Sequence, residues 1–202
     1  MAKKIKLYNS SEGYDLASGS YDRKEAYLNS FEKGEILGIL GDVRGKKILD
    51  VGAGTGRLSV LLAGGGAEVT AIDVSESMLK ILSKKNRKIK IMIGDAENLP
   101  FAENSFDAVT AAFLIVHLKE PKYFFDEAYR VLRAGGQLLI TNINQKEPPA
   151  VKTVAGDIKI ESFYHRPDSV RETLESLAFA IEKEKIIKEN GVWINQIILA
   201  KK

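Results

Sequence analysis

The sequence predicts an α/β protein built on a doubly wound sheet whose strands are mostly parallel. Three observations indicate this class. Short apolar runs alternate with amphipathic segments between residues 46 and 142. Glycine-rich turns separate many of these segments. Near the end of the chain, Asn190-Gly191 joins two strand-like segments, and this dipeptide is typical of a tight turn between antiparallel strands. We therefore expect a parallel sheet that ends in an antiparallel hairpin.

Composition limits the kind of protein. The chain has 202 residues, which suits a single domain spanning residues 1–202, and 45% of them are apolar. A net charge of +3 does not indicate a nucleic-acid partner. No apolar run reaches the ~18 residues of a membrane-spanning helix, and the basic N-terminus lacks the apolar centre of a signal peptide. With no cysteine, disulfides and cysteine metal sites are excluded. We expect a cytoplasmic protein without a membrane partner or a metal site.

The first 45 residues are predicted to form a helical N-terminal cap. Tyr14 and Tyr21, each followed by aspartate, are seven residues apart, so two helical turns place them on one face. Apolar residues between positions 25 and 40 predict one or two further helices, interrupted at Gly34. Residues 41–45 form a turn that leads into the first strand of the sheet.

The middle of the chain, residues 46–142, is predicted to be the core. Gly64-Gly65-Gly66 is a strong helix stop, Ser75 is a suitable N-cap, and Pro121 is placed to open a helix. The predicted strands are 46–51, 67–73, 88–93, 106–113 and 137–142, and the predicted helices are 57–63, 76–86 and 122–132.

The last part of the chain, residues 143–202, is expected to hold an acceptor-side segment and the terminal hairpin. Residues 143–166 contain Pro148-Pro149 and Gly156 and are interpreted as irregular. A helix follows over 168–178. Strands over 180–189 and 192–202 then complete the hairpin.

Acidic and small residues follow four consecutive strands. Ligands of open α/β sheets bind beyond the carboxyl ends of the strands, so these residues are candidates for a binding site. Asp73 lies 19 residues after Gly54 and is placed to accept both hydroxyl groups of a ribose. Asp95 follows the third strand and can accept an exocyclic amine. Ala111 and Ala112, at the end of the fourth strand, leave room for a ligand.

The glycine loop differs from a dinucleotide fingerprint. A Gly-x-Gly-x-x-Gly motif needs a third glycine where this chain has Arg57, since the loop reads Gly52-Ala53-Gly54-Thr55-Gly56. Asp50, just before the loop, suits a ligand with a cationic end, such as an ammonium group, better than a pyrophosphate. A NAD-linked oxidoreductase is therefore the least favoured function.

Five sequence blocks, taken in order, resemble class I S-adenosylmethionine-dependent methyltransferases, in the small-molecule branch that resembles the ubiquinone/menaquinone C-methyltransferases. The resemblance covers about residues 46–142 and implies a Rossmann-like sheet of about seven strands with the last strand antiparallel. It also implies S-adenosylmethionine as cofactor and S-adenosylhomocysteine as product. The blocks are residues 48–58, 71–79, 94–101, 105–109 and 131–138.

The resemblance implies roles for single residues. The glycine loop would approach the methionine part of the cofactor, Asp73 the ribose, and Asp95 the adenine amine. Tyr21 would act as a lid over the methionine end. The residues assigned to the cofactor are Tyr21, Asp50, Gly52, Ala53, Gly54, Gly56, Asp73, Val74, Met78, Asp95, Ala96 and Ala112.

Two histidines, His117 and His165, are the candidate catalytic residues. Methyl transfer is an in-line displacement, so a general base is needed only when the acceptor must lose a proton early. His117 follows the fourth strand, where related enzymes often have a His-His pair, but Val116 occupies the first position here. In the family, the segment that holds His165 faces the acceptor.

Methyl transfer to a small-molecule acceptor is the main hypothesis. An RNA methyltransferase, including one acting on a tRNA wobble base, or a protein methyltransferase is an alternative. The missing cysteine argues against cytosine C5 chemistry, and no acidic cluster indicates a metal-dependent reaction. A module that binds S-adenosylmethionine without catalysis is the alternative of another class.

Overall fold

A seven-stranded sheet forms the centre of the protein in the computed structural model, which describes residues 5–32, 34–153 and 156–202. Its strand order is β4-β3-β2-β5-β6-β10-β9, and β10 is antiparallel to both of its neighbours while the other pairs are parallel. The order reverses between β2 and β5, which opens a binding crevice at their carboxyl ends. The bounds are β2 (Lys47–Val51), β3 (Glu68–Asp73), β4 (Lys90–Ile93), β5 (Phe106–Ala111), β6 (Leu132–Ile143), β9 (Ala180–Glu189) and β10 (Val192–Lys201).

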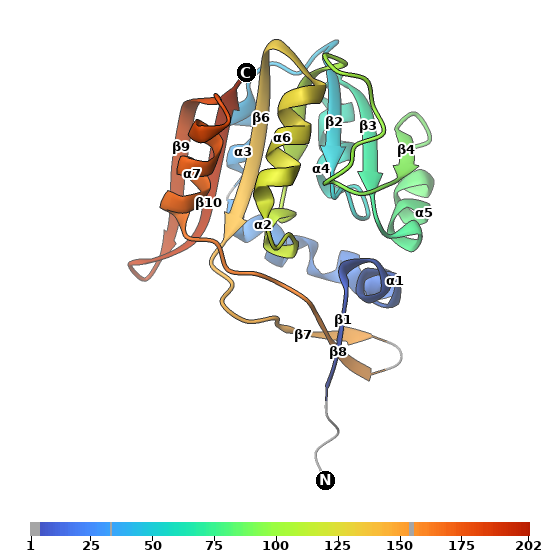
Figure 1. Ribbon diagram of the computed structural model, residues 1–202. Helices are drawn as coiled ribbons and strands as arrows, with labels where there is room; N and C mark the ends of the chain where they lie inside the picture. The colour runs from blue at the N-terminus through green and yellow to red at the C-terminus, as the bar shows by residue number, and fades with distance from the viewer. Residues whose placement is uncertain (1–4, 33, 154–155) are drawn as a thin grey trace.

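Helices cover both faces of this sheet (Figure 1). On one face, α6 and α7 pack through Phe124, Phe125 and Leu174, which are fully buried. On the other face, α3, α4 and α5 contribute a second apolar cluster that includes Leu62 and Leu82. The doubly wound α/β class predicted from the sequence is therefore confirmed. The bounds are α3 (Glu35–Leu40), α4 (Arg57–Gly64), α5 (Glu76–Lys85), α6 (Pro121–Val131) and α7 (Pro167–Ser176).

The terminal hairpin is also confirmed. Asn190 and Gly191 both have positive φ, at 48° and 78°, as the tight turn between twisted strands requires. The turn brings β10 between β6 and β9 and so produces the antiparallel end of the sheet.

A cap lies over the carboxyl ends of the parallel strands (Figure 1). It contains α1 (Ser10–Tyr21), the short 3₁₀ helix η1 (Asp22–Lys24) and α2 (Glu25–Glu32). A helix near the start of the chain and the break at Gly34 agree with the sequence, since Gly34 precedes α3 with a left-handed φ of 73°.

The cap also holds a small three-stranded sheet that the sequence did not predict. Its order is β1-β8-β7, from β1 (Lys6–Tyr8), β7 (Ala150–Thr153) and β8 (Gly156–Ile160). The interpretation of residues 143–166 as irregular is therefore wrong for β7 and β8. Helix α1 packs closely on β8, because a Cβ at Gly13 would lie 2.7 Å from the Ile160 side chain.

Carboxylates of the cap bind the amino-terminal ends of core helices. Asp15 accepts hydrogen bonds from the Ser75 hydroxyl at 2.6 Å and the Ser77 amide at 3.0 Å, at the start of α5. Asp22 accepts one from the Thr55 hydroxyl at 2.6 Å, next to α4. Such positions favour negative charge, because the amides of a first helical turn have no partner within the helix.

A buried ion pair completes these contacts. Arg57, the first residue of α4, donates two hydrogen bonds to the Glu32 carboxylate at 2.6 and 2.8 Å. Glu32 is only 3% exposed, and the planar fork of the guanidinium fits both oxygens. We call Asp15, Asp22 and Glu32 the cap carboxylates.

Among the described residues, no helix combines the length and the apolar character that a bilayer crossing requires.

Candidate active site

Two cavities meet where the cap covers the sheet. Each has a volume of about 330 Å³. The first cavity lies between α1 and the carboxyl ends of β2 and β3, and the second lies between α1, α2 and the segment around β7 and β8. The four residues that line both are Tyr14, Tyr21, Phe113 and His117. The two cavities are therefore neighbours that share these side chains as a common boundary.

The first cavity brings together most of the residues assigned to the cofactor. They come from the glycine loop, the end of β3, the start of α5, the loop after β4 and the end of β5. The assigned residues that line it are Tyr21, Gly52, Gly54, Asp73, Val74, Met78, Asp95, Ala96 and Ala112.

Asp73 connects the glycine loop to the start of α5. Its two carboxylate oxygens accept hydrogen bonds from the amides of Gly54 and Ser75, each at 2.8 Å. Burial raises the pKa of Asp73, and the two amides act in the opposite direction. Because a carboxylate offers about four acceptor positions, Asp73 retains capacity for a pair of ligand hydroxyl groups.

Asp50 and Gly56 do not line the first cavity. The Asp50 carboxylate is 1% exposed and accepts hydrogen bonds from Ser59 at 2.5 Å and Thr110 at 2.7 Å, while burial raises its pKa to about 6. It borders only a small third cavity, together with Ala53. Gly56 lines none of these cavities; a Cβ there would overlap the Leu82 side chain, so this glycine allows the loop to pack on α5.

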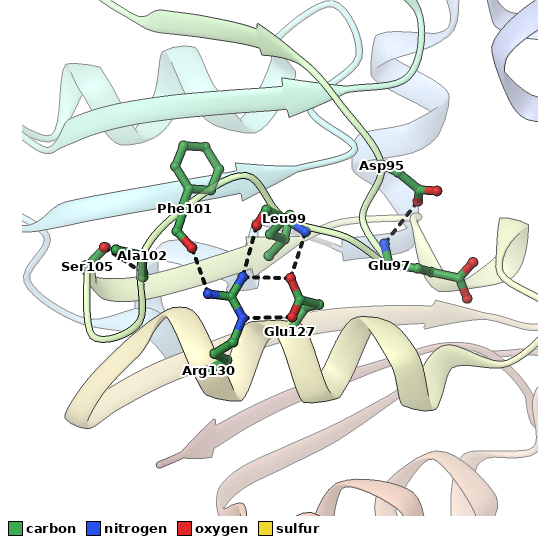
Figure 2. A network of polar contacts seen from close by, with 8 residues as sticks. All are labelled: Asp95, Glu97, Leu99, Phe101, Ala102, Ser105, Glu127 and Arg130. Atoms are coloured by element: carbon green, nitrogen blue, oxygen red, sulfur yellow. Dashed lines mark hydrogen bonds and ion pairs between the residues drawn. The ribbon is translucent and has the colours of Figure 1, made fainter.

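The loop after β4 is held in place by two side chains of α6 (Figure 2). Glu127 accepts a hydrogen bond from the Leu99 amide at 2.7 Å. Arg130 donates to the carbonyls of Leu99 at 2.9 Å and Phe101 at 2.7 Å, and it pairs with Glu127. We call Glu127 and Arg130 the loop brace. The same loop carries Asp95, whose carboxylate accepts from the Glu97 amide at 2.9 Å.

The walls of the second cavity are largely aromatic and aliphatic. Tyr27 and Phe31 of α2 stack edge to face with ring centres 5.0 Å apart, and Phe31 meets Phe113 at 6.2 Å. Val116 and Ile160 add aliphatic surface. Tyr27 is 63% exposed and lies at the open side of the cavity. Such walls suit a planar, apolar ligand.

His117 lies at the boundary of the two cavities and is bonded on both ring nitrogens. Its Nδ1 lies 2.8 Å from the Glu161 carbonyl oxygen, and its Nε2 lies 2.6 Å from the Tyr14 hydroxyl. A carbonyl can only accept, so Nδ1 carries the proton and Tyr14 donates to Nε2. Burial lowers the pKa of His117. Burial, then Tyr21 and Asp73, raise the pKa of Tyr14.

His165 does not reach either cavity. Its Nε2 lies 2.9 Å from the Leu118 carbonyl and 3.0 Å from the Ile115 carbonyl. These carbonyls flank the 3₁₀ helix η2 (Ile115–His117), so His165 fixes the turn that carries His117. The expectation that His165 faces an acceptor is not supported by this position.

Two residues of the site have weak sequence signals. Tyr14 could be found only through its spacing from Tyr21, and the rings do meet, with centres 5.8 Å apart. Phe113 has a φ of 58°, which an aromatic residue rarely adopts, and its amide donates to the Thr141 hydroxyl at 2.8 Å. No pattern in the sequence predicts such a backbone conformation.

Comparisons with known proteins agree with this architecture. Residues 49–140 match the family model described as a methyltransferase domain. The chain is 40% identical over 119 residues to a demethylmenaquinone methyltransferase of Renibacterium salmoninarum. The aligned stretch covers 59% of this chain and 50% of that protein. The chain spans about half of the length of the curated relatives it matches.

Solved structures share the fold. An S-adenosylmethionine-dependent methyltransferase from Mesorhizobium loti has a TM-score of 0.73 at 17% identity, over 87% of this chain and 100% of that one. A magnesium protoporphyrin IX methyltransferase from Synechocystis, solved with bound S-adenosylmethionine, has a TM-score of 0.67 at 18% identity, over 90% of this chain and 82% of that one.

The family match places a methyltransferase domain at residues 49–140, and the chain shares the fold of solved S-adenosylmethionine-dependent methyltransferases. Within that class it resembles the quinone C-methyltransferases, so the resemblance in the motifs is confirmed.

Proposed function

We propose that the protein transfers a methyl group from S-adenosylmethionine to a small, planar and largely apolar acceptor. The observation that carries this proposal is the meeting of two cavities of equal size, one bordered by the buried Asp73 carboxylate and one by aromatic rings. The relatives are named for demethylmenaquinone, which points to an acceptor of the quinone kind.

The first cavity fits the cofactor on its own chemistry. Asp73 is a carboxylate with only 9% exposure that borders the cavity and suits ribose hydroxyl groups. Asp95 suits the adenine amine, and the buried Met78 gives an apolar surface for the ring. Bound S-adenosylmethionine supplies an electrophilic methyl group on sulfur, so the task of the chain is to align the acceptor and exclude water.

On this proposal the chain works as one domain. Residues 46–142 hold the cofactor, while residues 1–45 and 143–202 supply the acceptor side. The aromatic contacts in the second cavity favour a small ring over a peptide or a nucleotide, because phosphate or charged peptide groups would have no cationic partner among the described residues that line it.

A labelled-methyl experiment tests the proposal. The protein is offered labelled S-adenosylmethionine with one of three pools: hydroxylated naphthalenes bearing an alkyl chain, total tRNA, or unfolded protein. We expect label only in the ring compounds. The variant Asp73→Ala is expected to lose cofactor affinity about tenfold or more, because two backbone amides lose their acceptor.

Other outcomes identify the alternatives. Label only in tRNA or in protein would contradict a small acceptor. Binding of S-adenosylmethionine by calorimetry without label in any pool would favour a module that only binds the cofactor. Binding of NAD in its place would contradict the assignment of the first cavity.

A further inference from the structure

We propose that Tyr14 and His117 form a relay that removes the proton from a ring hydroxyl group of the acceptor. The inference rests on the proposed function and deepens it, because it requires an acceptor whose hydroxyl group must ionise for methyl transfer. In this relay, Tyr14 contacts the acceptor, and His117 receives the proton at the end of the transfer.

The relay follows from the direction of its hydrogen bonds. The Glu161 carbonyl fixes the proton of His117 on Nδ1, at 2.8 Å, and leaves Nε2 with a free electron pair. The Tyr14 hydroxyl donates to that pair at 2.6 Å. Its oxygen therefore has acceptor capacity for a hydroxyl group in the second cavity, which Tyr14 lines. The chain of donors thus runs from the acceptor to Glu161.

Location makes the pair suitable for catalysis. Tyr14 and His117 are among the four residues that line both cavities, so a hydroxyl group bonded to Tyr14 lies at the boundary where the methyl group must cross. The two rings meet edge to face with centres 5.2 Å apart, which holds the pair in one arrangement. The same arrangement spans three elements, since α1 supplies Tyr14, η2 supplies His117 and Glu161 follows β8.

The surrounding charges support the direction of transfer. Tyr21 of α1 and Asp73 of β3 face Tyr14, and Asp95 and Glu97 border the same cavity. Burial lowers the pKa of His117, so at neutral pH the ring is neutral and its Nε2 electron pair is free to accept from Tyr14. Burial and these two neighbours raise the pKa of Tyr14, so Tyr14 stays protonated and passes a proton on without becoming an anion.

The step balances in atoms and electrons. The O–H bond of the acceptor breaks, its proton joins the Tyr14 oxygen, and the proton of Tyr14 moves to Nε2 of His117. The electron pair left on the acceptor forms the bond to the methyl group, and the sulfur of the donor keeps the pair of the broken bond. If a ring carbon is methylated, that carbon then gives up its hydrogen and the oxygen regains one. His117 finally returns one proton to solvent.

Substituted naphthols test the relay. The series varies the acidity of the hydroxyl group, and single-turnover methyl transfer is measured between pH 6 and 9 for the wild type, Tyr14→Phe and His117→Asn. We expect both variants to be about 100-fold slower or more with the least acidic naphthol, a typical effect of general-base loss. The deficit should shrink as the naphthol becomes more acidic and as the pH rises. Affinity for S-adenosylmethionine should stay within about threefold.

A matched control and a wild-type measurement keep the test independent of folding. Tyr123→Phe removes a hydroxyl from a tyrosine that is 59% exposed on α6 and should behave as the wild type. The wild type alone should lose activity only below the usual histidine pKa of 6.5, since burial shifts His117 downward. A deficit that is equal for every naphthol and every pH, or a wild-type rate independent of naphthol acidity, would overturn the relay.

The experiment distinguishes a failure of the proposed function from a failure of the relay. If the wild type methylates no naphthol but does methylate tRNA or protein, the small-molecule acceptor is wrong, and the relay falls with it. If the wild type methylates naphthols and the variants keep its rate, the function stands and only the relay is overturned.

Discussion

At the scale of single residues, Asp50 shows why sequence position does not settle a role. Its place before the glycine loop suggests a contact with a cationic ligand group. In the structure, it lies opposite Thr110 in the pairing of β2 with β5, and the two residues are hydrogen-bonded. A ligand carboxylate and a buried structural one look alike in sequence, because both end a strand. The partners at positions 59 and 110 become neighbours only after folding.

The raised pKa of Asp50 predicts a pH dependence of stability. In the folded protein the group binds a proton up to about pH 6, while the unfolded chain releases it near the usual value of 3.8. The folded state thus holds more protons between these values, so the contribution of Asp50 to the free energy of unfolding falls as the pH rises through this window, by about 3 kcal/mol in total.

Urea unfolding of the wild type and Asp50→Asn checks this dependence. We expect the variant to gain stability relative to the wild type between pH 4 and pH 6.5, since asparagine does not titrate. One of the two hydroxyl partners can still donate to its amide oxygen, and the other can rotate to accept from its amide nitrogen. A constant difference across this range would show that Asp50 titrates normally.

At the scale of elements, the loop brace predicts a specific kinetic change. The brace satisfies three backbone groups of the loop that carries Asp95 and Ala96, so its loss should loosen the first cavity without touching the acceptor. Arg130→Lys replaces a planar fork by a single point charge, which cannot reach both carbonyls at once. We expect the KM for S-adenosylmethionine to rise roughly fivefold with kcat little changed.

Arg133→Lys is the matched control for the brace. Arg133 pairs with Asp107 at 2.6 Å, outside the first cavity, and makes no contact with the carbonyls of Leu99 or Phe101. An equal rise in KM for both variants, or a fall in kcat confined to Arg130→Lys, would contradict the brace as a positioning device.

The elements of the core could be predicted from sequence, and the small sheet of the cap could not. Strands β2, β3 and β5 each hold three or four apolar residues in a short, largely buried stretch, and their helices are set by local signals such as Ser75, which accepts from the Met78 amide. The alternation in Asp157-Ile158-Lys159-Ile160 is the signal that could have revealed β8. Its partner β1 is about 150 residues away, and no local pattern specifies a pairing over that distance.

The site, too, contains some residues that the sequence predicts and others that it does not. The positions of Asp73, Asp95 and the glycine loop at the first cavity could be predicted, because each lies at or just after the end of a strand. The link from Tyr14 to His117 could not, since it joins residues 103 positions apart through a helix and a turn. The resemblance implies an acceptor-side position for His165, but its hydrogen bonds to two carbonyls near η2 hold it outside both cavities.

At the scale of the whole molecule, the cap carboxylates predict how the site opens. Burial acts to raise the pKa of Asp15, but hydrogen bonds from Ser75 and Ser77 outweigh it and hold the pKa below its usual value. The carboxylate is therefore ionised throughout the neutral range, and its contacts weaken only as the pH falls below about 4. The pKa of Asp22 is also lowered, because its contacts with Lys85 and the Thr55 hydroxyl outweigh the opposite effect of burial.

The double variant Asp15→Asn/Asp22→Asn should release S-adenosylhomocysteine roughly five- to tenfold faster. It weakens contacts that hold the cap closed, while the two apolar clusters of the core are unchanged. Stopped-flow displacement measures release, and hydrogen exchange in α1 should rise in parallel. Glu76→Gln, which removes an exposed ion pair with Lys80 on α5, is the control. Faster exchange across the central sheet as well would mean general destabilisation.

One segment, α1, forms a wall of both cavities, and this predicts an order of events in the proposed turnover. While α1 is lifted to admit the donor, the second cavity lacks Tyr14 and Tyr21 and has no defined shape. We therefore expect the acceptor to arrive second, past the exposed Tyr27, and its methylated product to leave first. Steady-state kinetics should then follow an ordered sequential reaction, in which the demethylated donor competes with fresh donor and not with the acceptor.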